Sequence, residues 1–414
     1  RQRFFGVPIP LWYPLDDNGI TLWDRPLTPD EGDLPVDPSS DVPSGFQESD
    51  RGCIGGFVGE VDVMDTWATS SLSPQIACGW GEDADLFART YPMDMRPQAH
   101  DIIRTWLFST VVRSHLEEDA APWRHCALSG WILDPDRKKM SKSKGNVVTP
   151  KALLDKYGSD AVRYWAANGR PGTDTAFDEG QMKIGRRLAI KILNASKFAL
   201  TLAVDSRPAP NLITEPLDQA LLSRLAVLVE TATAAFEDFD YARALERTEQ
   251  FFWGFTDDYV ELVKARAYGS RGSDDAVSAH VALSVTLDAL LRLFAPFLPF
   301  VTAEVWSWSH DDSLHRSDWP THEKLFSRLP AGFDTDLFDA ASETLSEVRR
   351  AKTEAKKSLK VEVEKVVVSA ERDHLDLLGL VRDDLMEAGN ISTFDLVEKN
   401  QPAAQVEVTL AEEK

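Results

Sequence analysis

The fold is decided by the stretch Gly130-Trp131-Ile132-Leu133-Asp134-Pro135-Asp136-Arg137-Lys138-Lys139-Met140-Ser141-Lys142-Ser143-Lys144-Gly145-Asn146. An apolar, strand-like run ends in a turn, and a loop rich in lysine follows it. A helix is then predicted to begin at Thr149-Pro150, with threonine as the N-cap and proline at the first helical position. Five cations lie between Arg137 and Lys144, interleaved with hydroxyl groups. Because lysine is a compact charge on a flexible stem, this loop is suited to holding a polyphosphate.

The pentapeptide Lys139-Met140-Ser141-Lys142-Ser143 is the second signature sequence of the class I aminoacyl-tRNA synthetases, a family that the chain resembles. Three further segments resemble the valyl branch of that class, namely residues 1–10, 62–71 and 100–103. The isoleucyl and leucyl branches are the nearest rivals, and Asp62–Ser71 favours the valyl branch over them. A non-catalytic tRNA-binding protein with the same fold and a generic nucleotide-binding α/β protein are also compatible with parts of the pattern.

The composition is that of a globular protein, with 43% hydrophobic and 27% charged residues in 414. Its apolar stretches are interrupted by proline or charge, so we expect no membrane span. The three cysteines form no CxxC pair, which suits a reducing cytoplasm. The net charge of −22 argues against a nonspecific nucleic-acid binder but does not exclude tRNA, because binding depends on where the cations lie; no DNA partner is expected.

The predicted fold class is α/β followed by mostly α. We expect the C-terminal half of a Rossmann-type class I catalytic domain, then an anticodon-binding helical bundle, then a small α+β appendage. The predicted domain ranges are 1–165, with an irregular insertion at 16–56; 166–208 for stem-contact and linker helices; 209–335 for the bundle; and 336–414 for the appendage. The insertion carries ten acids against two arginines and shows no sustained periodicity.

Periodicity predicts the individual elements. Strands are expected near 94–98 and 125–129, with a helix over 101–116 between them. Gly158 is expected to end one helix, with Ser159 or Asp160 as the N-cap of the next. Further predicted helices cover 180–203, 217–238, 241–268, 274–294 and 299–308; the appendage is predicted to form a helix over 336–358, a strand over 361–369, a helix over 373–388 and two short strands.

The resemblance implies a two-step reaction. The enzyme joins valine to ATP, with Mg²⁺, releases pyrophosphate, and passes the valyl group to tRNA(Val). Such chemistry depends on positioning and charge stabilisation rather than on a protein nucleophile. Lys139 and Lys142 carry over as the signature lysines, Lys142 stabilising the departing pyrophosphate. Ser141 and Ser143 either donate hydroxyl hydrogen bonds or shape the loop.

Four more candidate site residues rest on the resemblance. His100 and Asp101 are expected to face the ATP ribose, although Asp101 alone also suits an N-cap. Trp67 is expected to wall the valine pocket, although an ordinary core tryptophan would fit the same pattern. Asp65 either orients this segment, which we favour, or contacts the substrate amine. The eight histidines show no metal-like spacing with the cysteines, so no structural zinc is predicted.

Basic residues after the signature are candidates for contact with tRNA. The predicted set is Arg163 and Arg170, together with Arg349, Arg350 and Lys356 from the most basic helix of the chain; a solvated helix face would equally explain the latter three. The family's His-x-Gly-His signature, which grips ATP, is absent because no two histidines stand three apart. We therefore expect a C-terminal portion that begins downstream of the editing domain and is inactive in isolation.

Overall fold

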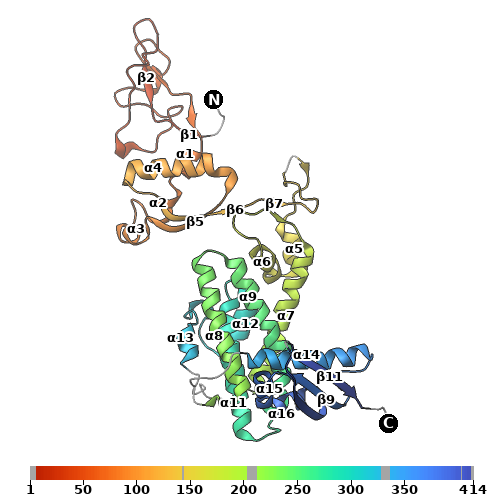
Figure 1. The fold of residues 1–414 in the computed structure, drawn as a ribbon. Helices are drawn as coiled ribbons and strands as arrows, with labels where there is room; N and C mark the ends of the chain where they lie inside the picture. Colours follow the sequence, from red (N-terminus) through yellow and green to blue (C-terminus); the bar gives the residue numbers. More distant parts are fainter. Residues whose placement is uncertain (1–5, 142–143, 203–211, 328–335, 402, 412–414) are drawn as a thin grey trace. The chain divides into compact units, whose positions relative to one another are not determined.

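The computed structural model describes residues 6–141, 144–202, 212–327, 336–401 and 403–411 (Figure 1). The chain divides into two compact units, Arg1–Trp131 and Ile132–Lys414, each with its own packing. This division lies upstream of residue 165, where the sequence placed the end of the first domain. The predicted domain limits therefore stay predictions.

A parallel β-α-β segment forms the centre of the first unit. Strands β5 (Met93–Ala99) and β6 (Trp123–Ser129) pair in parallel, which confirms both predicted strands. The crossover begins with a 3-10 turn (His100–Ile102) and a π-helical turn (Ile103–Leu107), and only then becomes helix α4 (Phe108–Glu118). A continuous helix over 101–116 is wrong because Ile102 leaves the helical region, with φ −103° and ψ 11°.

Helix α4 has an apolar stripe that the described residues of its unit leave exposed. Phe108, Val112 and Leu116, spaced four residues apart, are 62%, 40% and 76% exposed. Residues i, i+4 and i+8 share one helix face, so they form a continuous surface. The inward side of the crossover is different, since Trp106 is buried and stacks on Trp123 with ring centroids 5.6 Å apart.

The rest of the first unit consists of short elements. Two antiparallel pairs are formed by β1 (Val7–Pro8) with β4 (Val63–Met64) and by β2 (Trp12–Pro14) with β3 (Phe57–Gly59). The helices are α1 (Trp67–Ser70), α2 (Ser73–Ala77) and α3 (Ala84–Thr90). Residues 16–56 contain 3-10 turns at Glu31–Asp33 and Glu48–Asp50, and Arg51 ties this segment together by donating to the Pro38 and Asp41 carbonyls.

The second unit opens with two short strands and two helices. Strand β7 (Ile132–Leu133) pairs in parallel with β8 (Thr175–Ala176), and α5 (Pro150–Tyr157) and α6 (Ser159–Ala167) lie between them in sequence. Gly158, with φ 86°, caps the end of α5 and the start of α6. The expectation that Ser159 or Asp160 is the second cap is wrong, because the Asp160 carboxylate accepts instead from the N–H groups of Phe300 and Val301.

A helical bundle follows, and its long helices agree with the predicted ranges. Its elements are α7 (Glu179–Leu202), α8 (Pro216–Glu237), α9 (Tyr241–Gly254), α10 (Val260–Ala267), α11 (Ser273–Phe294), α12 (Pro299–Trp306) and α13 (His322–Phe326). A π-helical turn (Phe255–Tyr259) interrupts the helix predicted over 241–268.

By length and composition, α8 and α11 are the two helices in the described residues that would also suit a membrane span. However, 56% and 72% of their most apolar windows are buried within the molecule. Their apolar faces are therefore occupied by the bundle core, as in the central helices of a globular domain.

The tail packs as a small α+β element against the bundle (Figure 1). Its helices are α14 (Leu337–Glu354), α15 (Arg372–Leu380) and α16 (Arg382–Gly389). Its sheet has the order β10-β9-β11, from Ile391–Glu398, Val363–Ala370 and Gln405–Leu410. The central strand β9 is parallel to β10 and antiparallel to β11.

Candidate active site

The lysine-rich loop leaves β7 through a tight turn. Asp134 donates its backbone N–H to the Lys138 carbonyl at 2.8 Å, and Arg137 donates to the Asp134 carbonyl at 2.9 Å. Arg137 adopts a positive φ of 60°, which closes the turn. An isolated antiparallel bridge then pairs Lys139 with Leu133. The turn thus returns the first signature lysine to the end of β7.

Two side chains hold this loop from within. One carboxylate oxygen of Asp134 accepts the Lys138 N–H at 2.8 Å, and the other accepts the Asn146 side-chain amide at 2.8 Å. The amide oxygen of Asn146 accepts the Ser141 N–H at 2.9 Å, and its nitrogen also reaches the Lys139 carbonyl at 3.3 Å. The hydrogen bond from Asn146, followed by that from Lys138, lowers the pKa of the Asp134 carboxyl.

Sequence reasoning missed Asp134 and Asn146, although a polar residue directly after an apolar strand was a visible signal. Among the residues predicted to bind ATP, Lys139 is exposed and Ser141 is half-buried. Lys142 and Ser143 lie outside the described residues, so their roles stay predictions.

In the first unit, His100 and Asp101 lie where β5 ends, in the 3-10 turn that opens the crossover. His100 donates through Nδ1 to the Ser129 carbonyl at 3.2 Å, and its ring lies 4.6 Å from that of Trp131. The N-cap of this turn is Ala99, so Asp101 does not occupy the cap position. Both side chains are exposed at the carboxyl edge of a parallel strand pair, the usual place for ligands in α/β folds.

The Asp65 carboxylate accepts the Trp67 N–H at 3.1 Å and faces the Thr66 hydroxyl at 3.4 Å. This contact shapes the entry into α1, which begins at Trp67. The far end of α1 is tied to the crossover, since the Trp106 indole donates to the Ser70 carbonyl at 2.8 Å. Trp67 itself is half-buried.

Several of the predicted tRNA-contacting residues have partners within the protein. Arg163 donates to the carbonyls of Phe297 and Pro296 at 3.2 and 2.7 Å. Arg170 forms an exposed ion pair with Glu246 at 3.3 Å.

In the tail, Arg349 pairs with Asp258 at 2.9 Å, Arg350 pairs with Glu347 at 2.5 Å, and Lys356 follows α14 with a φ of 54°. Arg163 and Arg349 therefore serve at least to join elements of the second unit.

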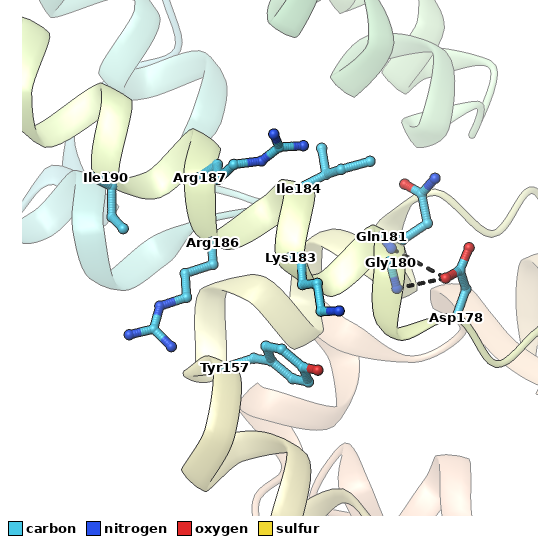
Figure 2. A pocket seen from close by; sticks show the side chains of 9 residues that line it. All are labelled: Tyr157, Asp178, Gly180, Gln181, Lys183, Ile184, Arg186, Arg187 and Ile190. Atoms are coloured by element: carbon cyan, nitrogen blue, oxygen red, sulfur yellow. Dashed lines mark hydrogen bonds between the residues drawn. The ribbon is translucent and has the colours of Figure 1, made fainter.

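A different basic surface lies along the first half of α7. A hollow of about 770 Å³ is lined by residues that include Lys183, Arg186 and Arg187. Figure 2 shows these three side chains extending from α7. Arg186 also donates to the Lys156 carbonyl at 2.9 Å. Sequence reasoning did not single out this group, although residues at i, i+3 and i+4 share a helix face.

Two family models match most of the chain. The model described as tRNA synthetases class I (I, L, M and V) matches residues 1–178, and that described as the anticodon-binding domain of tRNA ligase matches residues 218–368. The chain belongs to the class I aminoacyl-tRNA synthetases. It contains class I catalytic-domain sequence followed by an anticodon-binding domain, with mixed helix and strand content.

Two curated relatives of this synthetase chain are valine–tRNA ligases. The chain is 60% identical over 99% of its length to the valine–tRNA ligase of Thermobifida fusca, and covers 46% of that protein. It is 57% identical over 99% of its length to the valine–tRNA ligase of Salinispora tropica, and covers 49% of it. The chain thus spans about half the length of the curated relatives that it matches.

A solved structure shares the fold of this synthetase chain. The LeuRS–tRNA–LeuAMS ternary complex of Agrobacterium radiobacter matches 78% of the chain and 42% of its own chain, with a TM-score of 0.63 and 20% identity. Within the described part of the synthetase chain, no three His, Cys, Asp or Glu residues gather in a way that would hold a metal ion.

Proposed function

We propose that this chain is the C-terminal portion of a valine–tRNA ligase, which activates valine with ATP and transfers it to tRNA(Val). The observation that carries the proposal is the Lys139–Ser143 signature, in a loop framed by Asp134 and Asn146, within a chain 60% identical to a valine–tRNA ligase. The valyl relatives at 57–60% identity favour valine over isoleucine and leucine as the amino acid.

In this proposal the signature lysines act on the triphosphate. A carboxylate oxygen of valine attacks the α-phosphorus, the bond to the bridging oxygen breaks, and pyrophosphate leaves with the charge. Lys142, together with Lys139 of the same signature, stabilises that charge as it develops. Mg²⁺ arrives with ATP as part of the substrate and neutralises phosphate charge.

The remaining candidate residues for ATP and valine lie in the first unit. His100 and Asp101 bind the ATP ribose, Trp67 walls the valine side chain, and Asp65 orients the segment that carries Trp67. The exposed stripe on α4 and the two-stranded parallel sheet support the idea that this unit is one part of a larger Rossmann-type domain. Parallel sheets are normally covered on both faces, so further elements of the catalytic domain would lie against it.

The helical second unit binds the tRNA. The bundle is the anticodon-binding part, and the cations of α7 neutralise backbone phosphates, as point charges do without regard to sequence. Arg170 and Arg350, whose ion pairs lie at the surface, are the sequence-predicted candidates best placed to exchange an intramolecular partner for a phosphate. The enzyme would work in the cytoplasm.

The deciding test is valine-dependent ATP–pyrophosphate exchange by this chain, with and without a separately produced N-terminal half. We expect exchange only in the mixture, and loss of it on Lys142→Ala. Exchange with isoleucine or leucine instead of valine would assign the chain to a sibling enzyme. Silence with all three amino acids, from halves shown to associate, would indicate a non-catalytic tRNA-binding role. Charging of tRNA by the isolated chain would contradict the assignment of half an active site.

A further inference from the structure

The side chains of Asp134 and Asn146 form a clasp across the base of the lysine-rich loop, twelve residues apart in sequence and 2.8 Å apart in space. Asp134 is 8% exposed and directly follows β7. A carboxylate so little exposed is stable only when its oxygens are satisfied, and here the Lys138 N–H and the Asn146 amide satisfy one each.

The orientation of the Asn146 amide is fixed by its neighbours. Its nitrogen faces two acceptors, the Asp134 carboxylate and the Lys139 carbonyl, while its oxygen faces a donor, the Ser141 N–H. The reverse orientation would set oxygen against oxygen on one side and N–H against N–H on the other. One amide therefore grips the backbone on both sides of Met140.

We propose that Asp134 and Asn146 are positioning residues for the signature lysines. The clasp fixes the backbone from Lys138 to Ser141 relative to β7, and Lys142 is the next residue in sequence. Stabilisation of a transition state by charge is effective when the charge is already in place, because no energy is then spent on reorganisation during the reaction. The inference rests on the proposed function only for its catalytic consequence; the clasp itself is a property of this chain.

The two residues differ by one group, which allows a test by exchange. In Asn146→Asp, the carboxylate of residue 146 faces the Asp134 carboxylate. In Asp134→Asn, the new amide nitrogen faces a donor in either orientation, namely the Asn146 amide nitrogen or the Lys138 N–H. In the double variant Asp134→Asn/Asn146→Asp, the new amide donates to the new carboxylate, while the Lys138 and Ser141 N–H groups keep their acceptors. The Lys139 carbonyl loses its donor and faces a carboxylate oxygen instead, so the recovery is expected to be partial.

The first measurement is trypsin cleavage of the 414-residue chain within residues 137–144, followed by mass spectrometry. Each single variant is expected to be cleaved faster than the parent, and the double variant more slowly than either single one. Asp136→Asn is the matched control, because this exposed carboxylate lies in the same turn and its ion pair with the Lys138 ammonium is long, at 4.0 Å. Cleavage of the single variants at the parental rate would overturn the clasp.

The second measurement is pyrophosphate exchange by the full-length enzyme carrying the same substitutions. Each single variant is expected to lose about tenfold to a hundredfold in kcat, with the KM for valine unchanged, since an unsatisfied polar group in the clasp releases the loop without touching valine. The double variant is expected to regain about tenfold.

Faster cleavage with an unchanged kcat would overturn the positioning role and leave a purely structural clasp. Failure of the double variant to recover in either assay would show that the pair does not act through its mutual hydrogen bond. Absence of exchange by the parent enzyme would instead contradict the proposed function, and the trypsin result would still decide whether the clasp holds the loop.

Discussion

The lysine-rich loop and the junction between bundle and tail differ in the burial of their cations. In the loop, Lys138, Lys139 and Lys144 are exposed, and the polar groups that hold the backbone are Asp134 and Asn146. At the junction, the guanidinium of a buried arginine is itself the centre of the packing. The difference separates exposed cations, for which we propose a ligand, from a cation used as a structural element.

That arginine is Arg266, which is fully buried in α10. It donates to both carboxylate oxygens of Asp218 at 2.7 and 2.8 Å and to Asp384 of the tail at 3.1 Å. Tyr259 and Ser278 add hydroxyl hydrogen bonds to Asp218 at 2.7 and 2.6 Å. Burial opposes the charge of Arg266, but the hydrogen bond and attraction from Asp218 outweigh it and raise its pKa. The network joins α8, α10 and α11 of the bundle to α16.

The largest effect is expected from Arg266→Ala, which would leave Asp218 buried without its cation and Asp384 paired with Arg271 alone. Removing one partner of a buried ion pair costs about 3–5 kcal/mol, because the remaining charge stays in a poorly solvated site. Urea unfolding of the chain, followed by circular dichroism, measures this loss.

Arg372→Ala is the control for Arg266→Ala, because Arg372 and its partner Asp376 are 69% and 64% exposed. Solvent screens such a pair, so the unfolding midpoint should hardly move. Equal losses from the two substitutions would mean that the buried network contributes no more than a surface pair.

In the loop we expect a substitution to lower activity and to leave stability unchanged. Lys142→Ala should lower valine-dependent pyrophosphate exchange of the full-length enzyme by about 100- to 1000-fold, the typical cost of removing one group that stabilises developing charge. Its unfolding midpoint should stay at the parental value.

Lys144→Ala removes a neighbouring exposed cation outside the signature and should leave exchange within about twofold, since an exposed charge of this kind is screened by solvent. Equal losses from both lysine variants would reduce the loop to a general basic patch.

Local patterns predicted the helices well but not their interruptions or contacts. The 3.6-residue period over 217–238 and 274–294 depends only on residues close together in sequence. Helices α8 and α11 confirm these two predicted helices. The same period runs unbroken through 255–259, where the chain forms a π-helical turn. Gly158 caps α6 because Asp160 is used by a helix 140 residues away, a contact that no local pattern contains.

The candidate site also contains residues that a local motif predicts and contacts that only the folded chain brings together. The signature names Lys139 and Lys142 directly, whereas the contact of Asp134 with Asn146 exists only once the turn at Arg137 has formed. Arg163 looked available from its charge alone, yet carbonyl groups more than 130 residues away accept its hydrogen bonds. The chemistry assigned from residue type therefore stays a prediction, whereas the structure shows which cations long-range packing uses within the fold.

A smaller effect is expected at the α4 stripe. If other elements of the catalytic domain cover it, Leu116→Gln should weaken association of the chain with a separately produced N-terminal half. Loss of one buried leucine costs about 1.5–3 kcal/mol, or roughly 10- to 100-fold in Kd. Isothermal titration calorimetry measures it, and Glu117→Gln, an exposed neighbour on α4, is the control. Unchanged affinity for the Leu116 variant would place the interface elsewhere.

The smallest effect concerns Glu215, which precedes α8 beside the buried network and near Arg266, Asp275, Asp218 and Arg271. Burial, against the attraction of Arg266, raises the pKa of its carboxyl above the ordinary value of 4.5. The stability that this preference for a proton contributes is therefore fully present below pH 4.5 and is lost as the pH rises through the folded-state pKa.

Glu215→Gln removes this titration. Relative to the parent, the variant should gain on the order of a few tenths of a kcal/mol at pH 7, because the site is partly exposed, and nothing at pH 4. Urea midpoints at pH 4, 5, 6 and 7 measure the difference, with the exposed Glu230→Gln on the same helix as control. A difference that did not change with pH would show that Glu215 is not linked to the network. A pH-dependent change confined to Glu215 would instead show that the buried network around Arg266 affects the titration of a carboxyl at its edge.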